Sequence, residues 1–420
     1  MAHIKPFQSF YYNIDKIGDV AKVISPPYDI ISDEQLVYYH TLSPYNFTHI
    51  DLARSRSTDT KDNSRYTRAQ KLFEEWQKKE ILIQDEKPCV YIYKQDYTVM
   101  GQKYSRLGFI ALMRLEDGDD SKVFPHENTH AHTVDDRFQL TKTLNANLSC
   151  IFVCYGDKQR KVESIFNKKI VQKTPLIHVK DSEGVDHRLW RLDDPLLIRE
   201  INQSVEGQNL FIADGHHRYE VACAYRKLRS QRKSFTSDEP YDYVMTYFTN
   251  LDSRDLQIFP MHRIVKKFPK KLTFLEDYFR VDKMRSIDHM SIDLARAGLN
   301  EHAFGVYTKG EILLLRLKSK LMISEYVKEG SDDYKQLDAT LLKSFIFDKV
   351  GIDSKDIVYT KDINEVIFMV DTGAAEAGFI MNPVKISQLK AIALNGERMP
   401  PKTTYFYPKV LSGLTIYKME

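Results

Sequence analysis

The sequence predicts a mixed α/β fold, in the broad sense that includes α+β proteins, because strand-like and helix-like patterns of apolar residues alternate along the whole chain. A strand pattern at 209–213 leads into an amphipathic helix pattern at 219–228. Two further strand patterns, at 88–97 and 104–115, flank Met100-Gly101 as in a β-hairpin. The 420 residues, of which 42% are hydrophobic, suffice for about two or three domains with cores of their own.

The first fifty residues are predicted to form short elements. Ser32 or Asp33 is placed to cap a helix at 34–40. Apolar residues alternate in 46–52 as they do in a strand.

The remaining elements follow from the same two periodicities. We expect helices at 62–80, 140–147, 193–201, 273–278 and 338–350, and strands at 149–155, 241–249, 303–307, 311–317 and 376–381. The polar, basic stretch 226–238 predicts a helix end and an exposed loop. The chain changes character beyond Pro269, so we predict a domain at 1–265 and a second, α+β domain at 266–420.

Charge and cysteine content narrow the function classes. The net charge of +3, from 61 basic and 58 acidic residues, gives no reason to expect nucleic acid or a membrane as a partner. The cysteines lie inside or beside apolar runs, which suits a reducing compartment: Cys89, Cys150, Cys154 and Cys223. There is no signal-peptide pattern at the N-terminus, and no segment approaches about 18 apolar residues in a row. We therefore expect a cytoplasmic protein that acts on a small molecule; the sequence indicates no oligomeric state.

The most informative motif spans Phe211 to Glu220. Its strand ends in Asp214-Gly215 and a helix opens directly afterwards, so that backbone N–H groups and the positive end of a helix dipole meet at one spot. Such a spot attracts anions, and the side chains of His216, His217 and Arg218 add further donors. The alternative is an ordinary Asp-Gly turn followed by a solvated first helical turn. We predict that the Gly215 backbone and these three side chains hold a phosphate-bearing ligand, and that Asp214 binds Mg²⁺ or orients the acceptor.

A second candidate loop begins at Pro125. His126-Glu127-Asn-Thr-His130 has the spacing of a metalloprotease zinc motif, but the residues around it are poor helix formers and no third ligand is evident. We therefore expect that the side chains of this protein do not form a zinc site. We interpret this stretch as an active-site loop that closes over 214–218, with Glu127 as general base and His126 and Arg137 as phosphate-binding residues. A loop pinned by polar contacts is the alternative.

Two proline-containing segments are further candidates. Pro26-Pro27 imposes an extended approach to Tyr28 and Asp29, which form either a structural turn or part of a substrate site. The segment 398–409 combines cations with a stiff backbone, so Lys402 either contacts an anionic ligand or belongs to a rigid turn that covers the core.

The central motif resembles known sequences. Gly215-x-x-Arg218-Tyr219-x-x-Ala222 resembles the second box of the ParB and sulfiredoxin superfamily, and Asp-Gly-His-His-Arg is similar to the version in free serine kinases. His216 stands where sulfiredoxin has its reactive cysteine, so sulfinic acid reduction is not implied. Nearly the whole chain also resembles a large family of uncharacterised bacterial and archaeal proteins catalogued as a domain of unknown function. That match rests on Ser25 to Asp29, Tyr45-Asn46, Pro125 to Glu127, Asp136-Arg137, 146–149, 184–190, 250–252, His262-Arg263, 398–402 and 405–409.

These resemblances imply a fold and a function. The fold is a ParB/sulfiredoxin-like nucleotide-binding core with a large insertion at about 55–190, followed by the C-terminal domain. The function is a nucleotide-dependent phosphotransfer, from ATP or ADP with Mg²⁺, to a small hydroxyl-bearing metabolite, as in free serine kinase. In that picture Tyr28, Asp29, Asn46 and Lys402 contact the substrate. A non-catalytic nucleotide- or ligand-binding protein is the alternative, and a zinc-dependent hydrolase is a third possibility.

Overall fold

The chain forms two compact units. The computed structural model describes residues 3–116, 118, 120–231, 238–269 and 273–419. One unit comprises Met1–Pro125, Thr129–Leu256 and Pro408–Glu420, and the other comprises His126–Asn128 and Gln257–Tyr407. The sequence placed the boundary near residue 265 and assigned everything after it to the second domain. In the structure the chain crosses at residue 257 and returns at residue 408, because the last residues pair with the N-terminal part of the chain.

The first unit is built on a nine-stranded mixed sheet. Its main path runs in the order β6-β11-β8-β12-β5-β4-β10-β9, and β1 pairs with β5. Within it β8 is parallel to β12 and β6 is parallel to β11, whereas the other pairs are antiparallel. The strands are β1 (Ile4–Lys5), β4 (Val90–Val99), β5 (Gln102–Arg114), β6 (Val123–Phe124), β8 (Ile151–Tyr155), β9 (Ile177–Lys180), β10 (Asp186–Leu192), β11 (Leu210–Asp214) and β12 (Tyr243–Asn250).

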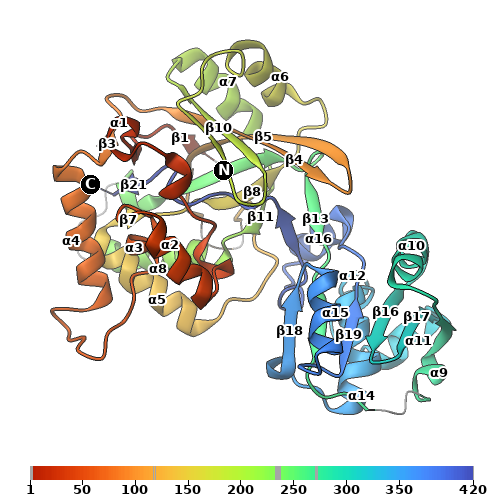
Figure 1. Ribbon diagram of the computed structural model, residues 1–420. Coiled ribbons are helices and arrows are strands. Elements are labelled where there is room, and N and C mark those ends of the chain that lie inside the picture. The colour runs from red at the N-terminus through yellow and green to blue at the C-terminus, as the bar shows by residue number, and fades with distance from the viewer. Residues whose placement is uncertain (1–2, 117, 119, 232–237, 270–272, 420) are drawn as a thin grey trace. The chain divides into compact units, whose positions relative to one another are not determined.

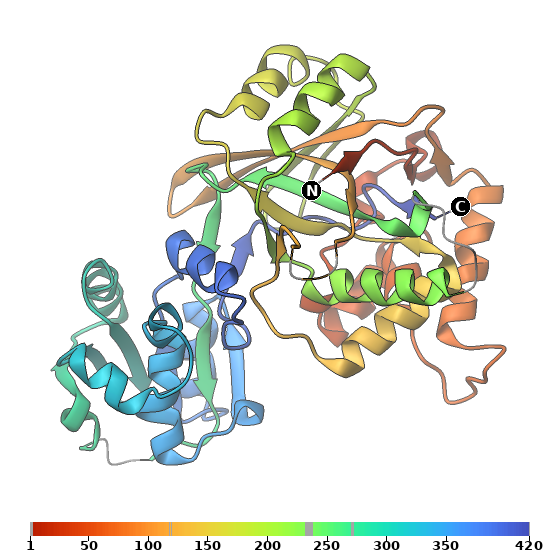
Figure 2. The same ribbon diagram turned by 180° about the vertical axis from the view of Figure 1, so that it is seen from behind.

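Helices lie on both sides of this sheet. In both views α6 (Lys161–Lys169) and α7 (Pro195–Val205) lie on one side, and α5 (Ala131–Leu144) and α8 (His216–Ser230) lie on the other (Figures 1 and 2). The predicted class, mixed α/β, is confirmed. The segment 55–190, which we expected as an insertion, contributes β4, β5, β6, β8, β9 and most of β10 to the same sheet and shares its hydrophobic core.

Smaller elements complete the first unit. They are α1 (Ile14–Ile17), α2 (Asp33–Leu42), α3 (Thr48–Asp51), α4 (Arg65–Lys78), and the strand pairs β2 (Phe10–Tyr12) with β3 (Leu82–Gln84) and β7 (Ala146–Asn147) with β21 (Tyr417–Lys418). Ser32 caps α2 as predicted, with a hydrogen bond from the Gln35 N–H. The predicted helices at 62–80 and 193–201 are confirmed as α4 and α7.

Two expectations about the elements were wrong. Residues 48–51, within the segment expected as a strand at 46–52, form a helical turn, because the side-chain oxygen Oδ1 of Asn46 accepts hydrogen bonds from the Thr48 N–H (3.1 Å) and hydroxyl (2.7 Å). The helix expected at 140–147 instead runs from Ala131 to Leu144. Packing decides this case, since Arg137, Leu140 and Leu144 form one buried face of α5 despite the poor helix formers before them.

The second unit contains a six-stranded antiparallel sheet in the order β15-β17-β16-β19-β14-β18. Its strands are β14 (His262–Val265), β15 (Phe279–Lys283), β16 (Ala303–Thr308), β17 (Glu311–Leu317), β18 (Ile357–Thr360) and β19 (Ala377–Ile380). The helices α10 (Ile287–Ala297) and α15 (Ile363–Asp371) pack on one face. The helix predicted at 338–350 packs on the other and is divided into α13 (Asp338–Leu342), a π-helical turn (Lys343–Phe347) and α14 (Asp348–Val350).

The second unit also has a two-stranded ribbon and four further helices. These are β13 (Gln257–Phe259) with β20 (Tyr405–Tyr407), α9 (Leu275–Tyr278), α11 (Leu321–Tyr326), α12 (Asp332–Lys335) and α16 (Ile386–Leu394). None of the helices in the described ranges has the length and apolar content needed to cross a membrane. Part of the loop predicted at 226–238 lies outside the described residues.

Candidate functional site

The predicted strand-to-helix turn is present at the centre of the first unit. β11 ends at Asp214, Gly215 takes a left-handed conformation (φ +89°), and α8 begins at His216. A Cβ atom at Gly215 would lie 2.9 Å from Nε of Arg218. The left-handed backbone favours glycine here, and a side chain would also have to displace the Arg218 guanidinium, which lies over the turn. Since glycine has no side chain, the N-cap residue itself provides no cap for the first N–H groups of this 15-residue helix.

Asp214 forms ion pairs with two cations. Its Oδ2 lies 2.6 Å from Nη2 of Arg218, and its Oδ1 pairs with Nζ of Lys409. All three side chains are about nine-tenths buried. Burial alone would raise the pKa of Asp214, but the charges of Lys409 and Arg218 outweigh it and hold this pKa well below its usual range. The carboxylate therefore holds two cationic side chains beside the start of α8.

Lys409 is the residue that our sequence analysis did not assign to this site. Its position is fixed through its backbone, because the Lys409 carbonyl accepts a hydrogen bond from Nε2 of Gln95 (2.8 Å) and the Pro408 carbonyl accepts one from Arg106. The sequence pointed to Lys409 only as a cation after a proline, in Tyr405-Phe-Tyr-Pro-Lys409. Asp214, with which Lys409 forms an ion pair, is distant in the sequence, so residue spacing did not reveal this pair.

The two histidines of the motif differ in their surroundings. His216 is buried. Nε2 of His217 accepts a hydrogen bond from the backbone N–H of His130 (2.9 Å), and the two imidazole rings stack 5.9 Å apart. The Thr129 hydroxyl also bonds to the Glu220 carboxylate. The chain just after Asn128 is thus fastened to the first turns of α8.

The first proline-containing segment meets the central motif. Tyr28 and Arg218 line one cavity of about 40 Å³, together with Asp51, Arg137, Asn147 and Ser149. Burial lowers the pKa of Arg218, but Asp214, Asp29 and Tyr28 raise it, and the net result is a raised pKa. Apolar side chains such as Leu140 and Val221 line the rest of the cavity, whose volume has room for about two or three water molecules. The structure therefore brings together two motifs that are far apart in the sequence.

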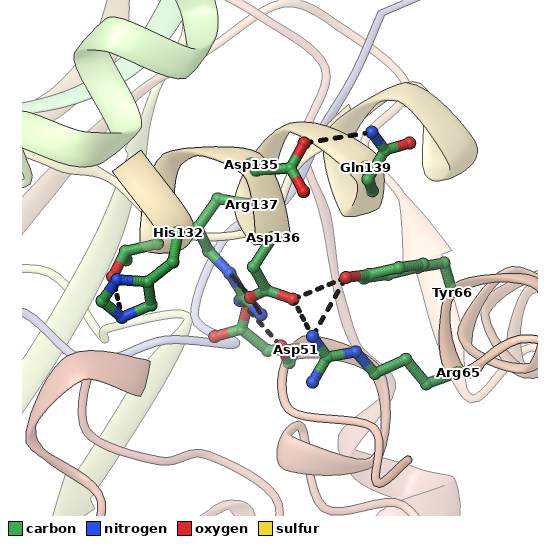
Figure 3. A network of polar contacts seen from close by, with 9 residues as sticks. Asp51, Arg65, Tyr66, His132, Asp135, Asp136, Arg137 and Gln139 are labelled. Atoms are coloured by element: carbon green, nitrogen blue, oxygen red, sulfur yellow. Dashed lines mark hydrogen bonds and ion pairs between the residues drawn. The ribbon is translucent and has the colours of Figure 1, made fainter. Parts of the chain in front are cut away.

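Arg137 belongs to a network of alternating charges behind this cavity (Figure 3). Its Nη1 donates to the carbonyl (2.8 Å) and carboxylate (3.0 Å) of Asp51, and its Nη2 donates to Asp136 (2.6 Å). Asp136 in turn accepts hydrogen bonds from Arg65 and from the Tyr66 hydroxyl (2.8 Å).

The other face of Arg137 supports the first proline-containing segment. Its guanidinium carbon lies 4.4 Å from the ring centroid of Tyr28, a cation–π contact. Arg137 thus fixes the position of Tyr28 and uses most of its N–H groups within the protein. Asp29, the next residue, is exposed.

Asn46, a predicted substrate contact, is fully buried and bonded within the protein. Its amide donates to the carbonyl of Lys22 (2.8 Å), in addition to the two bonds it accepts from Thr48. It fixes the loop before Tyr28 to α3.

The remaining predicted site residues lie in the second unit. Nε2 of His126 is 3.1 Å from the Thr404 hydroxyl, the His126 carbonyl accepts a hydrogen bond from the Met399 N–H (2.7 Å), and Glu127 pairs with Met399 in a parallel bridge. Lys402 is exposed on the same segment, with a left-handed backbone (φ 53°). The Pro-His-Glu loop and the 398–409 segment are therefore partners, and the phosphate, base and substrate roles assigned to His126, Glu127 and Lys402 stay predictions.

The His-Glu-x-x-His motif does not form a zincin helix. α5 begins only at Ala131, so His126 and His130 do not share one helix face. Within the described ranges, no group of three His, Cys, Asp or Glu side chains is arranged to hold a metal ion. A Mg²⁺ ion at Asp214 would have to displace Lys409 or share the carboxylate with it, and the role of Asp214 in Mg²⁺ binding stays a prediction.

Comparisons with known proteins give a family. Three solved structures resemble this fold at low identity and low TM-score: a conserved hypothetical protein from Pyrococcus furiosus (13% identity, TM-score 0.34, 69% of this chain and 89% of that one), a free serine kinase in complex with AMP (12%, 0.37, 68% and 84%) and SbnI with a C-terminal truncation from Staphylococcus aureus (9%, 0.37, 72% and 85%). A search of curated proteins gave no match. The profile described as "Protein of unknown function (DUF1015)" matches residues 4–340, and the chain belongs to this family.

Proposed function

We propose that the protein binds a nucleoside di- or triphosphate with Mg²⁺ at the first turn of α8, and transfers a phosphoryl group to a small hydroxyl-bearing metabolite. The observation that carries the proposal is the cluster of donors at this turn. A helix start without a side-chain cap at its N-cap residue meets the side chains of Arg218 and Lys409, which share one carboxylate. The sequence of this turn, Asp214 to Arg218, also resembles that of free serine kinases.

Each residue has a role in this proposal. The Gly215 backbone, His216, His217 and Arg218 hold the phosphates, and Lys409 adds a charge that we assign from the structure. Asp214 holds Arg218 and Lys409 in place beside the start of α8, where their charges attract the phosphates. Phosphoryl transfer depends mainly on positioning and on stabilising the charge of the phosphoryl group, which this set of donors supplies.

Calorimetric titration with Mg-ATP and Mg-ADP tests the binding site, with the variants Arg218→Lys and Arg229→Lys. Arg218→Lys keeps the charge but loses the planar fork, and we expect it to weaken nucleotide affinity about tenfold or more, since a charge-assisted hydrogen bond contributes about 1.5–3 kcal/mol. Arg229→Lys makes the same change near the other end of α8, where Arg229 contacts Tyr225, and serves as the control. Equal affinity in both variants would reject the assignment.

A second measurement separates catalysis from binding alone. In an assay of product nucleotide, ADP from Mg-ATP or AMP from Mg-ADP, with a panel of hydroxy amino acids and hydroxy acids, we expect Glu127→Gln to lower turnover about a hundredfold, as the loss of a general base does, and to leave nucleotide affinity nearly unchanged. If nucleotide binds but no acceptor supports turnover in the unaltered protein, the chain is a nucleotide-binding protein and the phosphotransferase proposal fails.

A further inference from the structure

The helices α6 and α7 lie on the side of the sheet away from α8 (Figures 1 and 2), and residues of both line a basic groove. It encloses a volume of about 900 Å³. One wall is a single face of α6, and the opposite wall is α7. Four lysines line it, Lys158, Lys161, Lys168 and Lys169, against the two carboxylates of Asp157 and Glu200. The proposed nucleotide site uses none of these residues.

Buried polar contacts fix the loop at one end of this groove. β8 and β12 are parallel neighbours, so their carboxyl ends lie at one edge of the sheet, and the groove begins there, at the loop after β8. Asn250, at the end of β12, donates from Nδ2 to the Asp157 carbonyl (2.8 Å) and accepts from the Asp157 N–H (3.1 Å).

The lysines near the start of α6 do not stabilise this helix by their charge. Cations at a helix N-terminus oppose the helix dipole, whereas cations in the last turn favour it. The last-turn residues Lys168 and Lys169 are therefore expected in any helix of this kind. Lys158 and Lys161 lie at the unfavourable end, beside the Asp157 carboxylate that accepts a hydrogen bond from the Val162 N–H (3.1 Å), and both line the groove.

The remaining lining side chains indicate the class of ligand. Lys161 and Lys168 are seven residues apart on the helix, a rise of about 10.5 Å, so the ligand has anionic groups at both ends. Among the described lining residues there is no arginine and no aromatic ring, which disfavours nucleotides and single-stranded nucleic acid. Ile165 is the single apolar side chain among them, which disfavours a lipid.

Between the charges, amide and hydroxyl side chains line the α7 wall, namely Gln203, Ser204 and, just beyond the helix, Gln208. These groups both donate and accept hydrogen bonds, as a peptide backbone requires of its partners. An extended chain advances about 3.3 Å per residue, so acidic residues three or four apart span the lysine spacing. We propose that this groove docks an extended acidic peptide segment of a partner protein.

Fluorescence anisotropy with a labelled decapeptide of alternating Glu and Ser tests this proposal on the full chain at low ionic strength. We expect saturable binding that weakens as salt is added, because exposed ion pairs are screened. The double variant Lys161→Glu/Lys168→Glu should weaken binding about tenfold or more, since two attractive contacts become repulsive. The matched control is Lys71→Glu/Lys78→Glu, which makes the same charge change with the same spacing on the exposed face of α4.

Three results would overturn the proposal. One is the absence of peptide binding by the unaltered protein at low salt. Another is an equal loss in both double variants, which would show only an effect of net charge. The third is tighter binding of inorganic polyphosphate or oligouridylate than of the peptide, with the same dependence on Lys161 and Lys168, which would assign the groove to a different polyanion. The nucleotide titration of the α8 site is independent of all three.

Discussion

Asp214 determines the charge arrangement at the start of α8. Burial disfavours the ionised form of a carboxylate, and a neighbouring cation favours it. A second cation shifts this balance further toward the ionised form. Without Asp214, Arg218 and Lys409 would face each other as like charges in a mostly buried space. The carboxylate is thus needed for the fold as well as for the proposed phosphate site.

Asp214→Asn should lower the free energy of unfolding by about 3–5 kcal/mol at pH 7, because it removes the carboxylate that pairs with two buried cations. The pKa of Asp214 in the folded state lies below the value of the unfolded chain, about 3.9. Its contribution is therefore fully present above about pH 4 and is lost as the pH falls through the folded value. Urea denaturation from pH 7 down to acid pH should show the two proteins converging at the acid end.

The control for this measurement is Asp135→Asn. Asp135 is exposed on α5 and makes one long hydrogen bond, from Gln139 (3.3 Å), so its loss should change stability by less than about 0.5 kcal/mol. A similar cost for both variants would contradict the paired, buried state of Asp214.

The sequence identified part of this site and not the rest. The turn at Asp214-Gly215 could be predicted because a strand pattern, a turn dipeptide and a helix pattern follow one another directly. Lys409 and the support of Tyr28 by Arg137 could not, because those contacts join residues far apart in the chain. Asn46 stays a predicted substrate contact, and the bond from its amide to the Lys22 carbonyl could not be read from any local pattern.

At the scale of elements, the prediction succeeded where one local signal dominates. Val90–Val99 and Gln102–Arg114 form the expected hairpin because Met100 and Gly101 both take positive φ values (49° and 77°), as a two-residue hairpin turn requires. It failed at α5, whose first half has a weak pattern and is held by packing of Arg137, Leu140 and Leu144. The helix propensities of these residues do not take that packing into account.

The hairpin turn offers a stability test. Met100 is fully exposed and left-handed, a conformation that costs an ordinary residue about 1–2 kcal/mol and asparagine less. Met100→Asn should therefore raise the free energy of unfolding by about 0.5–1 kcal/mol, measured by urea denaturation. Lys103→Asn, on the exposed part of the adjoining strand, is the control and should give no gain, since asparagine is a poor strand former. A loss of stability in Met100→Asn would mean that the turn has a different backbone conformation.

At the scale of the molecule, the chain returns to its first unit at its C-terminal end. Residues 408–420 belong with 1–125 and 129–256, and both termini lie in that unit (Figure 1). Phe10 and Ile416 exchange backbone hydrogen bonds (3.0 and 2.9 Å), as do Ser25 and Ser412 (3.3 and 2.8 Å). The sequence pattern near residue 265 marked a change of composition, but long-range pairing of this kind leaves no local trace. The C-terminal segment is therefore part of the fold that carries Asp214.

Removal of residues 408–420 should consequently destabilise one unit and spare the other. The deletion removes Lys409 from Asp214 and the backbone partners of Phe10, Ser25 and β7, so the amides of Phe10 and Ser25 should lose protection in hydrogen-exchange mass spectrometry. The two hydrophobic clusters of the second unit draw all their residues from 264–381, so peptides from its six-stranded sheet should keep their protection.

The single change Lys409→Met separates the loss of the ion pair with Asp214 from the loss of backbone pairing, because it removes the charge and keeps the backbone hydrogen bonds. We expect it to leave Phe10 and Ser25 protected while it lowers the stability of the first unit, and a loss of protection in both units on deletion would contradict the division of the chain.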